Sequence, residues 1–435
     1  MARAPHVALI APPLSGHLNP MLALGQALAA RGISVTYFGP IETRAKVRAA
    51  GVGFVPVGAA THGVGDAARR AALLARADAL TGLRAVIDQM ARDTAMLVAE
   101  LPDAFAAAHV TAVVCDQLEP AGALVAQNLR LPYASLASAL PINRAAETPP
   151  YFTGWLPDTS LASPRVIAGA EQVYDLMTRA HGRVIAETAE AWGLPPQRTC
   201  QDTLSPDLDL WQIPKAYDFP RSGVGAQVRY VGPIRAEEAA EPVIADDRAI
   251  TRVIARARTQ PVVFASFGTL FGARVAALRA IATAANRVGL QAVIADGGRL
   301  SEDARGALQE TGAVVRTFVE QRALLDVARV CVTHGGMNTT MDALEAGVPI
   351  VACPIGFDQK ANAARVVWHG AGVSLPPSRR SARAMTTALE AVISDRSYRS
   401  AAGRLSNAIR ATGGRELAVD LVISALRLNS TARAG

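Results

Sequence analysis

The 435-residue sequence has very little lysine and no cluster of basic residues. Arginine supplies almost all of the positive side of the formal net charge of +7, because lysine occurs only at positions 46, 215 and 360. The arginines are scattered singly, and no basic run is interleaved with aromatic residues, which argues against nucleic acid as a partner. We interpret the charge as a solvated surface, or as an attraction to anionic lipid or to an anionic substrate.

Cysteine and long apolar runs are also scarce. The four cysteines have no close pairing, and three of them lie in apolar, strand-like segments, which predicts buried thiols in a reducing compartment. They are Cys115, Cys200, Cys331 and Cys353. No run of about 18 apolar residues is present and the first apolar run is only one strand long, so neither a membrane span nor a signal peptide is predicted. We expect a cytoplasmic protein that is at most peripherally associated with a membrane.

Several catalytic and metal-binding motifs are missing. The sequence has no Walker-type GxxxxGK[ST] loop, no HExxH zinc pair and no GxSxG nucleophile elbow. Asp207 and Asp209 form a carboxylate pair of the kind that holds a metal in some sugar transferases, but they lie in an irregular, proline-rich segment. No metal site is therefore predicted.

The sequence is organised around residues 331–359, CVTHGGMNTTMDALEAGVPIVACPIGFDQ. A buried strand, a glycine turn, a helix over 341–346 and a second strand over 350–352 are expected there. The unpaired N–H groups and the positive dipole end of such a helix favour an anionic phosphate. Gly335 and Gly336 let the backbone approach a ligand closely. We interpret the stretch as the cradle of a nucleotide diphosphate.

The rest of the chain alternates between strand and helix patterns and is long enough for two domains. The all-apolar run 7–11 predicts a central parallel strand, followed by a loop over 12–19 and a helix that begins at Pro20. A long helix is expected over 169–192. A composition shift over 232–247 predicts a linker, after which the strand–loop–helix pattern restarts at 262–266. The fold class is therefore α/β, with two doubly wound halves in series.

Ligands of open α/β sheets bind beyond the carboxyl ends of the strands, and this rule selects candidate residues. In the first half it selects His17 and Asp116, a general-base arrangement if the two side chains meet. His17 alone could cap a turn, and Asp116 alone could cap the next helix. In the second half the rule selects four polar clusters at four successive strand ends, at 266–269, 317–321, 334–340 and 358–359. Each could be a helix cap, but four together are hard to explain as structure.

With these residues in view, the chain resembles the family-1 glycosyltransferases, which have two Rossmann-like domains (the GT-B fold) and use nucleotide sugars. The signature covers 318–359, and GHLNP at 16–20 matches the N-terminal catalytic loop. Three positions depart from the family pattern: Phe318 replaces the usual uracil-stacking tryptophan, Glu320 replaces a proline, and Asp342 replaces the ribose-binding glutamate. A closer resemblance is to bacterial zeaxanthin (carotenoid) glucosyltransferases. It rests on IAPPLSGH, ALPINR, DFPR, VGPIR and FDQ…AARVVWHG.

The resemblance implies transfer of glucose from UDP-glucose to a hydroxyl of a carotenoid such as zeaxanthin, with inversion to a β-glucoside. UDP-glucose would be a co-substrate, with no metal and no other cofactor. Residues 1–232 would form the acceptor-binding domain, 233–247 the linker and 248–414 the nucleotide-sugar domain. Residues 415–435 would form a helix that packs back on the first domain. The two domains would face each other across a cleft.

The resemblance also assigns roles to residues. His17 would take the acceptor proton and Asp116 would orient it. The donor-binding residues would be Ser266, Gly268, Thr269, Phe318, Val319, Gln321, His334, Gly336, Met337, Asn338, Thr339, Asp342, Asp358 and Gln359. The acceptor-binding residues would be Leu14, Asn143, Tyr151 and Trp155. The alternatives are a transferase for another hydrophobic aglycone (polyketide, macrolide or flavonoid), a non-enzymatic nucleotide-sugar sensor, and a UDP-sugar epimerase.

Overall fold

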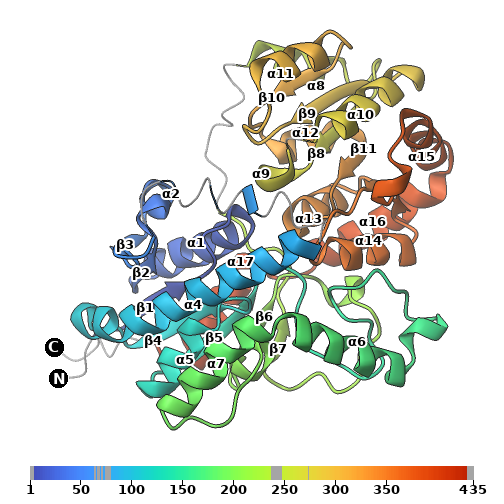
Figure 1. Ribbon diagram of the computed structural model, residues 1–435. Coiled ribbons are helices and arrows are strands. Elements are labelled where there is room, and N and C mark those ends of the chain that lie inside the picture. Colours follow the sequence, from blue (N-terminus) through green and yellow to red (C-terminus); the bar gives the residue numbers. More distant parts are fainter. Residues whose placement is uncertain are drawn as a thin grey trace.

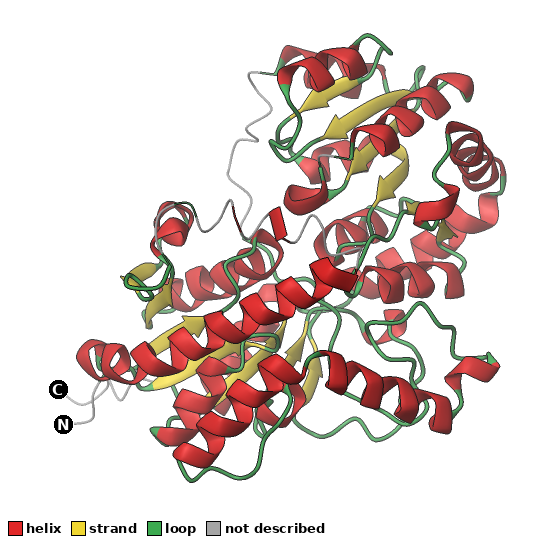
Figure 2. Ribbon diagram, viewed as in Figure 1, coloured by secondary structure: helices red, strands yellow, loops and turns green. Residues whose placement is uncertain are grey.

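The computed structural model describes residues 4–62, 65, 69, 72–73, 80–236, 247–272 and 274–428. It contains two α/β domains, each with one parallel sheet between layers of helices (Figures 1 and 2). The predicted fold class is confirmed. Most of the predicted linker and the tail beyond 428 lie outside the described residues.

The N-terminal domain is built on a seven-stranded sheet in the order β3-β2-β1-β4-β5-β6-β7. Its strands are β1 (His6–Ile10), β2 (Ser34–Gly39), β3 (Gly53–Pro56), β4 (Ala112–Asp116), β5 (Tyr133–Ala137), β6 (Asp209–Trp211) and β7 (Val228–Tyr230). Its helices are α1 (Ser15–Ala30), α2 (Arg44–Ala49), α4 (Leu80–Ala108), α5 (Ala121–Asn128), α6 (Pro164–Met177) and α7 (Arg179–Ala191). Alternation along β1 explains the layers, because Val7 and Leu9 pack in the cluster that holds α1, whereas Ala8 and Ile10 pack with α4 and α5.

The C-terminal domain is built on a six-stranded sheet in the order β10-β9-β8-β11-β12-β13. Its strands are β8 (Val262–Ser266), β9 (Gln291–Ala295), β10 (Val314–Arg316), β11 (Ala328–Thr333), β12 (Ile350–Ala352) and β13 (Gly372–Ser374). Its helices are α8 (Arg248–Arg256), α9 (Gly268–Phe271), α10 (Val275–Arg287), α11 (Glu302–Gln309), α12 (Gln321–Val327), α13 (Met337–Glu345), α14 (Gln359–Trp368), α15 (Ala382–Ser394) and α16 (Arg396–Arg410). In both sheets the chain order reverses at one pair of central strands, β1/β4 and β8/β11, and such switch points are where α/β sheets bind ligands.

The last helix, α17 (Gly414–Ala425), returns to the N-terminal domain and lies beside α1 (Figure 1). Val419 and Val422 belong to the same apolar cluster as β1 and α1. Arg31 at the end of α1 forms ion pairs with Glu416 and Asp420, both at 3.0 Å. The C-terminal segment therefore fastens the second domain to the first.

A buried polar contact also joins the two domains. Arg365 on α14 lies 2.8 Å from Asp218 of the N-terminal domain, and both side chains are almost completely buried. The same guanidinium lies over the ring of Phe219, and Arg221 pairs with Asp218 at 3.0 Å. A buried charge pair with additional partners favours one arrangement of the two domains, because its groups cannot be hydrated in another arrangement.

Three element boundaries differ from the sequence predictions. The predicted helix over 169–192 is two helices, because the Thr178 hydroxyl donates back to the Tyr174 carbonyl where α6 ends. Helix α13 starts at Met337 rather than at 341, and α1 starts at Ser15 rather than at Pro20. Within the described ranges, no helix is long and apolar enough to cross a membrane.

Candidate active site

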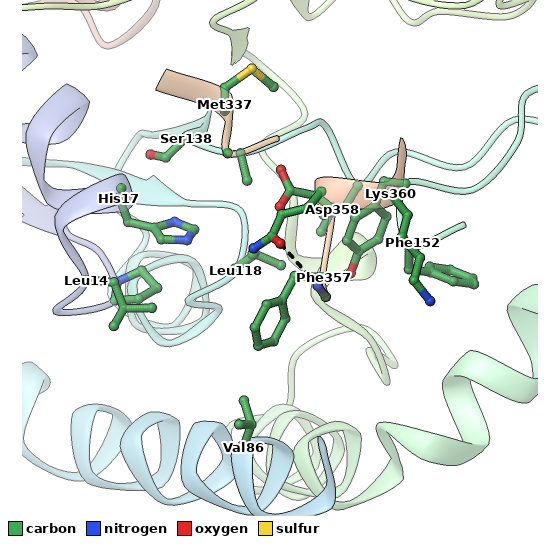
Figure 3. A pocket seen from close by; sticks show the side chains of 18 of the residues that line it. Leu14, His17, Val86, Leu118, Ser138, Phe152, Met337, Phe357, Asp358 and Lys360 are labelled. Atoms are coloured by element: carbon green, nitrogen blue, oxygen red, sulfur yellow. Dashed lines mark hydrogen bonds between the residues drawn. The ribbon is translucent and has the colours of Figure 1, made fainter. Parts of the chain in front are cut away.

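The carboxyl ends of both sheets face a cavity of about 1210 Å³ between the domains. Figure 3 shows His17 of the N-terminal domain and Asp358 of the C-terminal domain projecting into it. Every residue to which the sequence analysis assigned a catalytic, donor-binding or acceptor-binding role lines this cavity except Asp116, which lies behind His17. Residues from both halves of the chain are thus brought to one space.

The N-terminal side of the cavity holds a histidine–carboxylate pair. His17 Nδ1 lies 2.9 Å from Asp116 Oδ2, and the other carboxylate oxygen accepts the Leu118 N–H at 2.8 Å. Since Nδ1 is bound to the carboxylate, Nε2 is the nitrogen left for a ligand in the cavity. Burial by itself lowers the pKa of His17, but the Asp116 carboxylate outweighs it, so the pKa lies above its ordinary value. This arrangement can accept a proton at Nε2 and stabilise the imidazolium that forms.

His17 lies in the first turn of α1 and not in the predicted loop. Pro20, inside the helix, has no N–H to donate to the Gly16 carbonyl four residues earlier. That carbonyl instead accepts from Asn338 Nδ2 of the other domain, at 3.4 Å. The turn that carries His17 and the glycine turn of the second domain therefore touch directly.

The turn between β11 and α13 has the features of a phosphate site. Gly335 has φ of +85°, and a Cβ on Gly336 would lie 2.5 Å from His334 Nε2, so both positions require glycine. Gly336 caps α13 without a side-chain hydrogen bond, which leaves the first N–H groups of the helix available to a ligand. Burial lowers the pKa of His334 to about 4, so its imidazole is neutral near pH 7.

The turn after β8 lies against the same site. Ser266 Oγ accepts the Gly268 N–H at 3.2 Å, and Gly268 has φ of +67°. A Cβ on Gly268 would lie 3.1 Å from the His334 ring. Thr269 belongs to the short helix α9, where the sequence predicted a loop. The two turns are packed together through His334.

The position that replaces the family glutamate, Asp342, is held from two sides. Gln321 donates to Asp342 Oδ2 at 2.6 Å, and Thr339 donates to the same glutamine at 3.2 Å. Arg235 Nη2 approaches Asp342 Oδ1 to 2.5 Å, as an ion pair without hydrogen-bond geometry, and its Nη1 donates to Glu345. Asp342 is therefore fixed before any ligand binds.

Phe318, another residue that lines the cavity, has an open aromatic ring. Phe318 is 69% exposed, although most large apolar side chains of the chain are buried. Val319, which follows it, packs partly against the apolar core. An aromatic face left open at the rim of a cavity is suited to stack on a flat ring such as a nucleobase.

Asp358 and Gln359 use part of their hydrogen-bonding capacity inside the protein. Gln359 Oε1 accepts the N–H groups of Ile355 and Gly356 at 2.9 and 3.1 Å, which leaves its NH₂ as the free donor. Asp358 Oδ2 accepts from the Leu140 N–H of the other domain at 3.3 Å and from Asn362 at 3.1 Å. Burial raises the pKa of Asp358, an effect that the Leu140 N–H and nearby His17 partly offset.

Of the four predicted acceptor residues, two offer apolar surface to the cavity and two have side chains that are hydrogen-bonded within the protein. Leu14 and Trp155 line the cavity with apolar surface. The Tyr151 hydroxyl is bound to that of Tyr174 at 2.6 Å. Asn143 also lines the cavity, but its amide accepts from Gln117 at 3.1 Å and donates to Asp209 at 2.9 Å. Asn143 therefore shapes the wall, and its amide is already paired.

The carboxylate pair considered as a metal site is split by the fold. Asp209 is buried in β6 and accepts from Gln117, Asn143 and Trp211, whereas Asp207 is exposed. Among the residues that the structure describes, no group of three or more histidine, cysteine, aspartate or glutamate side chains is arranged to hold a metal ion.

Two residues at the site were missed by sequence reasoning. Glu119, three residues beyond Asp116, also lines the cavity, and the strand-end rule could have found it. Arg235 belongs to the VGPIR stretch that supports the resemblance, but no role was assigned to it, because it meets Asp342 only through the fold.

Comparison with known sequences gives one consistent result. The family sequence model described as UDP-glucoronosyl and UDP-glucosyl transferase matches residues 75–412. A zeaxanthin glucosyltransferase of Pantoea ananas is 35% identical over 418 residues, which is 96% of this chain and 95% of that protein. A zeaxanthin glucosyltransferase of Pseudescherichia vulneris is 34% identical over 84% of this chain and 85% of that protein.

Solved structures of similar fold are glycosyltransferases. The glycosyltransferase of kitacinnamycin aligns with a TM-score of 0.75 at 23% identity, over 98% of this chain and 100% of that one. A calicheamicin glycosyltransferase aligns with a TM-score of 0.73 at 23% identity, over 99% of this chain and 100% of that one. These likenesses establish the GT-B architecture of two facing Rossmann-like domains.

Proposed function

The chain belongs to the family of UDP-glucoronosyl and UDP-glucosyl transferases, and from that premise we propose that it is an inverting glucosyltransferase. It would move glucose from UDP-glucose to a hydroxyl of a carotenoid such as zeaxanthin. The observation that supports this most is the pairing of His17 with Asp116 at 2.9 Å, in the same cavity as the open N-terminus of α13. A proton acceptor and an anion site thus share one space.

In the proposed reaction the acceptor oxygen attacks C1 of glucose while the bond from C1 to the phosphate oxygen breaks. His17 Nε2 takes the hydroxyl proton, and Asp116 stabilises the resulting imidazolium. UDP leaves as the anion on the opposite face of the sugar, so an α-linked donor gives a β-glucoside. Intact His17 and Asp116 favour an enzyme over a nucleotide-sugar sensor.

The second domain would hold the donor. The N–H groups at the start of α13, with neutral His334, would bind the diphosphate and stabilise the charge on the leaving group. Phe318 would stack on uracil, and Asp342 would accept hydrogen bonds from ribose hydroxyls. Because a helix terminus and neutral donors would carry the charge, we expect transfer without a metal.

The sugar would lie between the two domains. Asp358 and the free NH₂ of Gln359 would hydrogen-bond glucose hydroxyls, since both side chains line the cavity and retain free capacity. Asp358 also accepts a hydrogen bond from the backbone N–H of Leu140, so a sugar held there would lie at a contact between the two domains.

The acceptor side would admit a long apolar molecule. Helix α6 lines the cavity and also presents exposed Val173 and Leu176, 58% and 62% exposed. Apolar side chains shared between a cavity and the outer surface would suit an acceptor that is drawn from a membrane, and we propose peripheral membrane contact at α6 by a cytoplasmic protein.

His17→Ala tests the proposal. Transfer should fall to near zero while UDP binding, measured by calorimetry, stays at the wild-type value, because the His17 side chain is hydrogen-bonded to Asp116 of the N-terminal domain and not to the residues proposed to hold UDP. Wild-type turnover in this variant would remove His17 as the base. An acceptor panel with UDP-glucose separates a carotenoid from the alternative, another hydrophobic aglycone such as a polyketide, macrolide or flavonoid.

A further inference from the structure

We propose that Glu119 is a second polar contact for the acceptor and binds an oxygen substituent next to the hydroxyl that reacts. The inference rests on the proposed function for the identity of the reacting hydroxyl. The acceptor would carry a ring with two neighbouring oxygen substituents, such as a hydroxyl beside a ketone.

Glu119 stands beside the catalytic pair. Its N–H donates to the Asp116 carbonyl at 3.1 Å, which closes a turn between the two residues. A turn of this kind brings the first and last Cα atoms to within about 7 Å. An oxygen bound by Glu119 therefore belongs to the end of the acceptor that enters near His17.

One oxygen of Glu119 is occupied inside the protein. Oε1 accepts from the Thr94 hydroxyl at 2.9 Å and from the Ala121 N–H at 3.3 Å. These partners belong to the N-terminal domain, so the residue lies on the acceptor side of the cavity. Glu119 as a whole residue is 4% exposed.

The other oxygen, Oε2, is free for a ligand. Among the described residues it has no hydrogen-bond partner, and it is not one of the sealed, unpaired polar atoms of the interior. Glu119 lines the cavity, so the remaining direction for Oε2 is the cavity itself. A buried polar atom that opens onto a predominantly apolar cavity is the kind of group that fixes the orientation of a ligand.

A chain of hydrogen bonds determines which carboxyl oxygen of Glu119 can carry a proton. Thr94 gives its one O–H to Glu119, so His181 Nε2, at 2.9 Å from the Thr94 oxygen, must be the donor there. His181 Nδ1 then faces the Cys200 sulfur at 3.8 Å as an acceptor. Every proton in the chain points toward Glu119, and Oε1 is left as an acceptor only.

The charge around Glu119 favours its neutral form. Burial and the nearby Asp93 carboxylate raise the pKa of Glu119 to about 8, so its proton is present near pH 7 and lies on Oε2. Asp93 is itself hydrogen-bonded to His62 at 2.8 Å and accepts from Gln89 at 2.7 Å. Glu119 therefore donates a hydrogen bond into the cavity, and a carbonyl oxygen is the group that such a donor selects.

The kinetic test compares two matched acceptors, zeaxanthin and the same carotenoid with a ketone beside each ring hydroxyl. The measured quantity is the ratio of kcat/KM for the keto acceptor to that for zeaxanthin. Glu119→Leu should lower this ratio about 3- to 10-fold, the value of one hydrogen bond, while Glu119→Gln should retain most of it because its NH₂ still donates. Glu190→Leu, an exposed change on α7, is the matched control. An unchanged ratio in Glu119→Leu would overturn the proposal.

A spectroscopic test needs no turnover, and its main readout comes from the wild-type protein. Resonance Raman spectra of the keto carotenoid bound to the wild-type protein should show the carbonyl stretch at lower frequency than in an apolar solvent. Glu119→Gln should shift it partway back. A carbonyl stretch equal to that in apolar solvent would contradict the inference. A lowered stretch in a protein that transfers no glucose would instead refute the proposed function and leave the Glu119 contact standing.

Discussion

Asp116→Asn removes the charge opposite His17 and keeps the size of the side chain. A unit charge pair at the observed 2.9 Å is worth roughly 5–6 kcal/mol at an effective dielectric constant of about 20. Removing a hydrogen bond to a charged group costs about 1.5–3 kcal/mol. These bounds predict a fall in kcat/KM of about 10- to 10⁴-fold, because the imidazolium that forms during transfer loses its partner.

The pH profile distinguishes this explanation from a general loss of activity. His17 must be neutral to act as a base, so activity is lost as the pH falls through its pKa. In the wild type Asp116 holds the pKa of His17 above 6.5, and without that carboxylate the lowering effect of burial remains. The acid limb of kcat/KM should therefore move to lower pH in Asp116→Asn. Asp207→Asn, at an exposed carboxylate, should leave both rate and limb unchanged. A limb that stays in place, or moves up, would refute the reasoning.

The remaining predictions concern the donor site and the domain interface. Arg235→Met should raise the Kd of UDP more than the Kd of 2′-deoxy-UDP, because Asp342 loses the partner that orients it toward ribose. Calorimetry with both ligands would show equal weakening if Arg235 is only structural. Phe318→Ala should raise the Kd of UDP by about 5- to 150-fold, the range for loss of one stacked base, and an unchanged Kd would exclude stacking there. Arg365→Met should lower the free energy of unfolding by about 3 kcal/mol, because it leaves the Asp218 carboxylate with one cation fewer in a buried site; denaturant unfolding at wild-type stability would contradict this.

Much of the fold could be predicted because a parallel strand that is covered on both faces appears in the sequence as a continuous apolar run. The run 262–266 is strand β8 with the predicted bounds, and the glycine turn before α13 lies where the residue pattern placed it. The strand-end rule also found the cavity residues, since it depends only on where each strand stops.

What could not be predicted depends on contacts between distant parts of the chain. The start of α1 at Ser15 is compatible with Pro20 because the Gly16 carbonyl, which Pro20 cannot pair within the helix, accepts from Asn338 of the other domain. The pairing of Arg235 with Asp342 joins positions more than a hundred residues apart. Asn143 looked free for a ligand in the sequence, yet Gln117 and Asp209 occupy its amide, and neither neighbour is adjacent in sequence.

The departures from the family pattern are explained in part by these contacts. Asp342 has a shorter side chain than glutamate, and Gln321 and Arg235 hold it from either side. Phe318 keeps an open aromatic face where the family has tryptophan. The structure gives no account of Glu320 in place of proline.

The most direct test of the central proposal is the product itself. Purified protein is incubated with UDP-glucose and zeaxanthin, and the product is characterised by mass spectrometry and by the anomeric proton coupling in its NMR spectrum. We predict a zeaxanthin glucoside with the β configuration, formed together with an equal amount of UDP. An α-linked product, or release of UDP at the same rate with and without zeaxanthin and no glucoside, would contradict the account.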